Sequence, residues 1–214
     1  MSDIFQEVDE ELRHDKWLQL WKQYQNYIIG VAVLIVVATA VVTYWKYYDQ
    51  QQREAEGLRY ALALDDARTG KPAAAADALT ALASGAHPGR AIIARFEAAA
   101  LRARAGDPAA AIAAYDAIAK DGSIDLVYRD LATVLWGLHA LDTIDPPAVI
   151  ERLQPLTAQD NPWHATAIEV TAAAHLKTGD RAAAKAEYQK IADDLKAPRG
   201  VRARATEMLA ALGS

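Results

Sequence analysis

The sequence contains no cysteine. This absence excludes disulfide bonds, thiolate metal sites, attachment of haem through cysteine and acylation of an N-terminal cysteine. It does not fix the cellular compartment, although a chain without cysteine avoids mispairing in an oxidising one. The fold must therefore be stabilised without disulfide bonds or thiolate metal sites, by packing and hydrogen bonding.

An excess of positive charge is absent as well. The chain carries 23 lysines and arginines against 28 aspartates and glutamates, which gives a formal net charge of −5. Six of the acidic and three of the basic side chains fall in the first 22 residues, so the remainder is nearly neutral. Because phosphate contacts need clustered lysine and arginine, nucleic acid is not an expected partner.

Catalytic motifs are missing too: the chain has no G-x-S-x-G, no phosphate-binding glycine loop and no dinucleotide fingerprint. His164 and His175 are spaced to share one face of a helix, but no metal-binding histidine–glutamate motif accompanies them. We therefore expect structural histidines, no metal, no cofactor, no small-molecule substrate and no enzymatic activity. An enzyme with an unrecognised site is the alternative, and it would need convergent polar residues in a pocket.

One long apolar run is present near the start of the chain. Residues 23–45 carry no charge, and residues 28–42 are almost entirely isoleucine, valine, leucine and alanine. Such a helix, at about 1.5 Å rise per residue, crosses a hydrocarbon core of about 30 Å. It is apolar on all sides, unlike the striped helices of soluble proteins, and aromatic residues flank both ends. The sequence predicts a transmembrane helix over residues 27–45. A signal peptide cleaved near Ala38-Thr39-Ala40 and a buried soluble helix are the alternatives.

The orientation of this helix does not follow from charge, since three basic residues lie close to the span on each side. A short cytoplasmic tail, residues 1–26, and an exported domain make the simpler topology. Trp17, Leu20, Trp21 and Tyr24 recur at helical spacing, which predicts either an amphipathic segment on the inner membrane surface or the aromatic base of one straight helix.

Three similar turns recur after the apolar run. Gly70, Gly106 and Gly179 each precede a run of three alanines, at spacings of 36 and 73 residues. The longer spacing is about two periods, so a degenerate turn is expected near residues 142–143, just before Pro146-Pro147. Four helix pairs with a period near 36 resemble the tetratricopeptide repeat of about 34 residues.

The register around each glycine supports this interpretation. Each glycine suits a left-handed helix cap, and Asp107 and Asp180 suit the caps of the following helices. Small residues mark the helix crossings: Ala63, Ala99, Ala172, Ala75, Ala111 and Ala184. Larger residues, Tyr115 and Tyr188, project toward the next pair. A last helix from Pro198 closes the stack with one apolar face, which consists of Val201, Ala205, Met208, Leu209 and Leu212.

The predicted fold is therefore all-α. It has an N-terminal single transmembrane helix, followed over residues 46–214 by a tetratricopeptide-like α-solenoid of about four helix pairs and a C-terminal capping helix. No proline lies between Tyr44 and Arg68, so we expect the span to continue unbroken into the first repeat helix.

The N-terminal tail carries a more specific resemblance. It is similar to the YfgM-type family, whose members are described as ancillary subunits of the bacterial Sec translocon, through Asp3-Ile4-Phe5-Gln6-Glu7-Val8-Asp9-Glu10-Glu11-Leu12-Arg13 and Leu20-Trp21-Lys22-Gln23-Tyr24. The resemblance implies a cytoplasmic tail, one inner-membrane span and a periplasmic tetratricopeptide domain. It also implies two protein partners, the Sec translocon and a membrane-anchored chaperone resembling prolyl isomerases. A related branch coordinates envelope constriction, so binding of cell-wall or division machinery is the alternative function.

A possible binding surface follows from the repeat register. Arg68, Arg104 and Lys177 each stand two residues before a turn glycine, which in tetratricopeptide geometry lies near the inner, concave edge. Stacked repeats would place these cations in a ladder that holds acidic groups or a carboxylate of a peptide. Cations near helix C-termini are also favoured by the helix dipole without any ligand, which is the alternative explanation. Four residues two turns earlier would line the same groove: Tyr60, Phe96, Thr133 and Glu169.

Overall fold

The computed structural model describes the backbone of residues 3–213 and the side chains of residue 21, residues 23–27 and residues 29–213. The side chains of Trp17 and Leu20, on which the predicted amphipathic stripe depends, lie outside the described residues. The chain divides into two compact units, Met1–Ala55 and Glu56–Ser214. The segment boundaries expected at residues 26 and 45 stay predictions.

The first helix is long and uninterrupted: α1 spans Asp3–Arg68. This confirms that the apolar segment continues into the first repeat helix without a break. Among the described residues, α1 is the one helix long and apolar enough to cross a membrane, and none of its most apolar window is buried. Leu34 and Val36, for example, are 69% and 67% exposed. A signal sequence meets the same criteria of length and composition.

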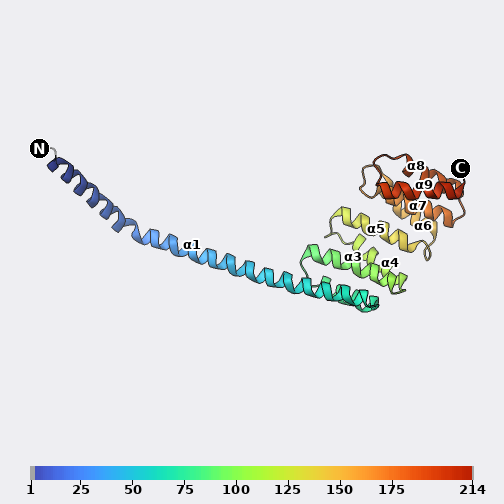
Figure 1. The fold of residues 1–214 in the computed structure, drawn as a ribbon, viewed down its shortest axis with the longest axis horizontal. Helices are drawn as coiled ribbons and strands as arrows, with labels where there is room; N and C mark the ends of the chain where they lie inside the picture. The colour runs from blue at the N-terminus through green and yellow to red at the C-terminus, as the bar shows by residue number, and fades with distance from the viewer. Residues whose placement is uncertain (1–2, 214) are drawn as a thin grey trace. The chain divides into compact units, whose positions relative to one another are not determined.

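The described regular structure of the second unit is helical throughout (Figure 1). The end of α1 pairs with the next helix, three further pairs follow, and one helix is left over at the C-terminal end. The remaining elements are α2 (Pro72–Ala83), α3 (Pro88–Arg104), α4 (Pro108–Ala119), α5 (Leu126–Ala140), α6 (Pro146–Leu153), the 3-10 helix η1 (Gln154–Thr157), α7 (His164–Lys177), α8 (Arg181–Asp193) and α9 (Arg199–Leu212). The predicted fold class is confirmed.

The three glycine turns have the geometry that the sequence predicts. Gly70, Gly106 and Gly179 have φ values of 86°, 82° and 81°, in the left-handed region that side-chain-bearing residues avoid. Asp107 and Asp180 each accept a hydrogen bond of 2.9 Å from a backbone N–H three residues later, at the start of α4 and α8. The predicted caps of both helices are confirmed.

Alanine lets the paired helices approach closely. The six alanines at the predicted crossings are almost completely buried, with exposures between 0% and 2%. Tyr115 and Tyr188 are also buried, as knobs between neighbouring elements. Because each core cluster is shared by successive helices, removal of water from apolar surface holds the stack together pair by pair.

The third helix pair departs from the pattern. Its second helix, α6, has only 8 residues, whereas α2 and α4 have 12 and α8 has 13. Proline starts α6 at Pro146, and Pro155 is the second residue of η1, which directly follows α6. Gly137 on α5 leaves room for Leu153, because an added Cβ would lie 3.0 Å from a methyl carbon of that leucine. The degenerate third unit predicted from the sequence is thus a close but shortened pair.

The C-terminal helix α9 closes the stack, as predicted. Val201 and Ala205 are buried, and Met208, Leu209 and Leu212 pack against the cluster formed by α7 and α8. At the other end of the second unit, Glu56 is a buried carboxylate with an exposure of 6%. Its oxygens lie 3.0 Å from His87 Nδ1 and 3.7 Å from Arg90 Nε, so an ionic contact ties α1 to the start of α3.

Candidate functional site

The three predicted ladder cations each lie in or near the last turn of the first helix of a pair. Arg68 ends α1, Arg104 ends α3 and Lys177 ends α7. All three are exposed. Among the described residues, Arg68 and Arg104 form no ion pair, whereas Lys177 Nζ lies 2.5 Å from a carboxylate oxygen of Asp142. Two of the cations are therefore available to a ligand and the third is already paired.

The four residues expected to line the same surface have different surroundings. Tyr60 packs against the first core cluster, and Phe96 lies 6.2 Å from Tyr115 between ring centroids. The Thr133 hydroxyl donates to the carbonyl of Arg129 within α5. Glu169 accepts two hydrogen bonds from the guanidinium of Arg204, at 2.6 and 2.7 Å. In the described part of the chain, no hydrogen bond or ion pair joins two of the seven predicted residues. The sequence-predicted surface stays a prediction.

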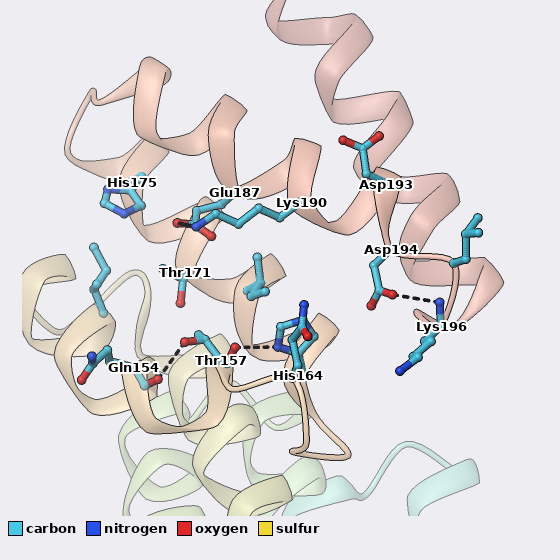
Figure 2. Close-up of a pocket in the computed structure, with 14 residues that line it drawn as sticks. Gln154, Thr157, His164, Thr171, His175, Glu187, Lys190, Asp193, Asp194 and Lys196 are labelled. Atoms are coloured by element: carbon cyan, nitrogen blue, oxygen red, sulfur yellow. Dashed lines mark hydrogen bonds and ion pairs between the residues drawn. The ribbon is translucent and has the colours of Figure 1, made fainter.

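A separate groove lies beside the shortened third pair (Figure 2). It has a volume of about 790 Å³, which is within the range of about 300–1,000 Å³ typical of ligand sites. One face of α7 forms its floor, α6 and η1 form one wall, and α8 with the following loop forms the other. The lining residues are Ile150, Gln154, Thr157, Gln159, His164, Ile168, Thr171, His175, Glu187, Lys190, Asp193, Asp194, Leu195 and Lys196.

The groove lies where the α-helical part of the third pair ends: α6 stops at Leu153, and the chain continues directly through η1 to Thr157. Ile150 of α6 and Gln154 and Thr157 of η1 line the wall on this side. His164 and His175 both line the groove, which confirms that their spacing places them on one face. Glu169 and Lys177 lie on the opposite side of α7, at about 100° per residue.

Hydrogen bonds fix the polar atoms of the floor and the first wall. His164 Nδ1 lies 2.6 Å from the carbonyl oxygen of Thr157, so this nitrogen donates the hydrogen bond and Nε2 is left for another partner. The Thr157 hydroxyl donates to the carbonyl of Gln154, which orients η1 (Figure 2). Thr171 is buried and donates to the carbonyl of Ala167, one turn earlier in α7.

The second wall carries three carboxylates and two lysines. Glu187 is neutralised by Lys190, whose Nζ lies 2.7 Å away. Asp193 and Asp194 stand at the C-terminal end of α8 and form no ion pair with any described residue. Asp193 accepts hydrogen bonds from Gln189, and Asp194 accepts one of 2.8 Å from the backbone N–H of Lys196. Two carboxylates that form no ion pair therefore stand at one end of the groove, together with Lys196.

Comparison with known families agrees with the helix pairing. The sequence profile of the tetratricopeptide repeat-like domain family matches residues 18–211. The chain belongs to this family. It matches no curated protein and no solved structure. Domains of this type act in protein–protein interaction, so the repeat unit of this tetratricopeptide-like protein indicates that it binds proteins.

The groove was not predicted from the sequence. Pro146, Pro147 and Pro155 indicate a degenerate third unit, and the histidine spacing indicates a shared face of one helix. The carboxylates Asp193 and Asp194, however, are 29 and 30 residues beyond His164 and reach the same groove only because α8 folds back along α7. A search for charged residues at the end of α8 opposing the helix dipole would have drawn attention to them.

Proposed function

We propose that this tetratricopeptide-like protein is a membrane-anchored scaffold of the bacterial inner membrane, without enzymatic activity. It would serve as an ancillary subunit of the Sec translocon that recruits a periplasmic chaperone to proteins emerging from the channel. The observation that carries this proposal is the combination, in one chain, of a membrane-length helix whose apolar side chains are uncovered and a solenoid of a protein-binding family.

Anchoring in the membrane would explain how the protein acts without catalysis. A span that contacts a channel and a solenoid that binds a soluble partner raise the effective concentration of that partner at the channel without any covalent step. Support for the translocon in particular comes from the resemblance of the acidic N-terminal tail to the YfgM-type family. The alternative, coordination of cell-wall or division machinery, would use the same anchor and solenoid with other partners.

Photo-crosslinking in living cells tests the proposal. A photoreactive amino acid replaces Val36, which is exposed in the apolar segment, or Phe96, on the predicted inner surface of the solenoid. We expect translocon subunits to be captured at Val36 and a chaperone at Phe96. Capture of wall synthases or division proteins at both positions would favour the alternative, and capture of cytoplasmic proteins at Phe96 would overturn the proposed orientation.

We also propose that Arg68 and Arg104 contribute the basic part of the inner surface, with Lys177 held by Asp142. The support is their exposure and the absence of an ion pair for either arginine among the described residues. Arg104→Glu should reduce cross-linking from Phe96 and leave that from Val36 unchanged. If capture at Phe96 is unchanged, the cations serve only the helix dipoles and the ladder is wrong.

A further inference from the structure

The groove beside the third helix pair has a charge pattern that helix stability does not explain. Negative side chains at the C-terminal end of a helix lie against the negative end of its dipole, and this placement is unfavourable. Asp193 is the last residue of α8 and Asp194 is its C-cap. Neither carboxylate forms an ion pair with a described residue: Lys190 pairs with Glu187, and Lys196, which also lines the groove, contacts Asp194 through its backbone N–H. A local preference is thus violated at the mouth of a groove, where such violations commonly serve a ligand.

The side chains on the floor and the two walls of the groove indicate which kind of ligand it binds. The second wall carries three carboxylates and two lysines, and its net negative charge favours a cationic ligand over acidic peptides, nucleotides and phosphate. Ile150 on the first wall and the exposed Leu195 after α8 provide apolar surface, and Ile168, itself largely buried, lines the floor. Gln154, Gln159 and His164 Nε2 provide donors and acceptors of the kind that bind a peptide backbone. Charge and apolar surface together therefore match a short segment of polypeptide in which an aliphatic residue neighbours a lysine or arginine.

We propose that this groove, between η1 and α8 over α7, binds a basic–aliphatic segment of a partner protein. The cationic side chain pairs with Asp193 and Asp194, and the aliphatic side chain packs against Ile150 and Ile168. This second surface lies on the other side of α7 from Glu169 and Lys177. The solenoid then has two binding surfaces of opposite charge, a basic inner edge and an acidic groove, and can hold two partner segments at once. The inference goes beyond the proposed translocon role and does not depend on it.

Binding of a defined peptide to the full chain tests this inference. The protein is reconstituted in nanodiscs of zwitterionic phosphatidylcholine, with empty nanodiscs as the blank. The probe is a fluorescein-labelled, amidated hexapeptide of alternating leucine and lysine, and fluorescence anisotropy measures its dissociation constant at low ionic strength. The comparison probe has glutamate in place of each lysine, and we expect it not to bind.

The decisive variant is Asp193→Asn/Asp194→Asn. Asparagine keeps one acceptor oxygen for Gln189 and one for the backbone N–H of Lys196 and removes both charges, so the variant should melt at the same or a higher temperature than the parent. We expect its dissociation constant for the lysine probe to rise at least tenfold. Asp125→Asn/Glu151→Gln removes the same charge from exposed positions that do not line the groove and should change the constant less than twofold.

A second variant tests shape instead of charge. Gln154→Trp places a large ring at an exposed position on the groove wall and should block the lysine probe without unfolding the core. The inference is overturned if the lysine probe does not bind, if both charge variants weaken it equally, or if Asp193→Asn/Asp194→Asn leaves it unchanged. None of these results alters the cross-links expected at Val36, so failure of this inference is distinguishable from failure of the translocon proposal.

Discussion

At the scale of single residues, Asp121 shows how a loop is fixed to the stack. It follows α4, and its carboxylate lies 2.6 Å from an Arg95 guanidinium nitrogen on α3. The hydroxyl and backbone N–H of Ser123 donate to its other oxygen at 2.6 and 3.1 Å. These hydrogen bonds from Ser123, followed by the one from Arg95, lower the pKa of the Asp121 carboxyl to about 2, from an ordinary value of 3.8.

A pH dependence follows from this pKa. Because the folded-state pKa lies below the unfolded value, the ionised carboxylate stabilises the fold above about pH 4. This contribution is lost as the pH falls from about 4 to about 2. We expect Asp121→Asn to be less stable than the parent at pH 7 and equal to it near pH 2. Urea denaturation in detergent, followed by circular dichroism between pH 7 and pH 2, measures the difference. Asp125→Asn is the control, and a parent-to-variant difference that does not change with pH would contradict the assignment.

The turn glycines make a second prediction at this scale. Gly106 has a φ of 82° with no atom within 4 Å of a built Cβ, so an alanine there is disfavoured by backbone conformation alone. Gly106→Ala should lower the free energy of unfolding by about 1 kcal/mol. Gly89, in the first turn of α3, is equally open but has no positive φ, and Gly89→Ala should be neutral or slightly stabilising. Equal effects of the two substitutions in thermal melts would refute the left-handed cap.

At the scale of helices, the turns of the first and second pairs differ in one detail. Asp107 caps α4 through a side-chain hydrogen bond, whereas Lys71, at the same position before α2, makes none. Asp107→Ala should therefore cost about 1 kcal/mol of stability, as N-cap substitutions do. Lys71→Ala removes only an exposed ion pair with Asp66 and should change stability little. Parallel urea titrations compare the two variants, and a larger loss for Lys71→Ala would contradict this account of the caps.

Much of the helical arrangement could be predicted from the sequence, because each pair depends on local signals. A glycine at each turn and alanines at fixed distances specify the pair before any long-range contact is considered, and an aspartate cap follows the glycine in two of the three turns. The third pair lacks these signals, and its prolines predict disruption but not the resulting shape. The groove depends on how far α6 extends along α7 and where α8 returns, which are tertiary quantities. The sequence therefore indicated His164 and His175 but not Asp193 and Asp194.

At the scale of the molecule, the chain combines two units with different requirements. Residues 1–55 contain an apolar helix segment whose side chains are uncovered, which water tolerates poorly and lipid accepts. Residues 56–214 form a solenoid with its own core and its own C-terminal cap. The carboxylate of Glu56 begins the second unit and ties α1 to α3 through His87 and Arg90. A helix long and apolar enough to cross a membrane and a solenoid of a protein-binding family thus lie in separate parts of one chain.

The measurement that tests this account most directly is the topology of the chain in cells. Since the sequence has no cysteine, Ser84→Cys in the loop after α2 and Gln6→Cys in the tail each provide a single labelling site. A membrane-impermeant maleimide is applied to intact and to lysed spheroplasts. We predict that Ser84→Cys is labelled in intact spheroplasts and Gln6→Cys only after lysis, with the full-length chain in the membrane fraction. Labelling in the reverse pattern, or a shortened chain released into the soluble fraction, would contradict a membrane-anchored protein with an exported solenoid.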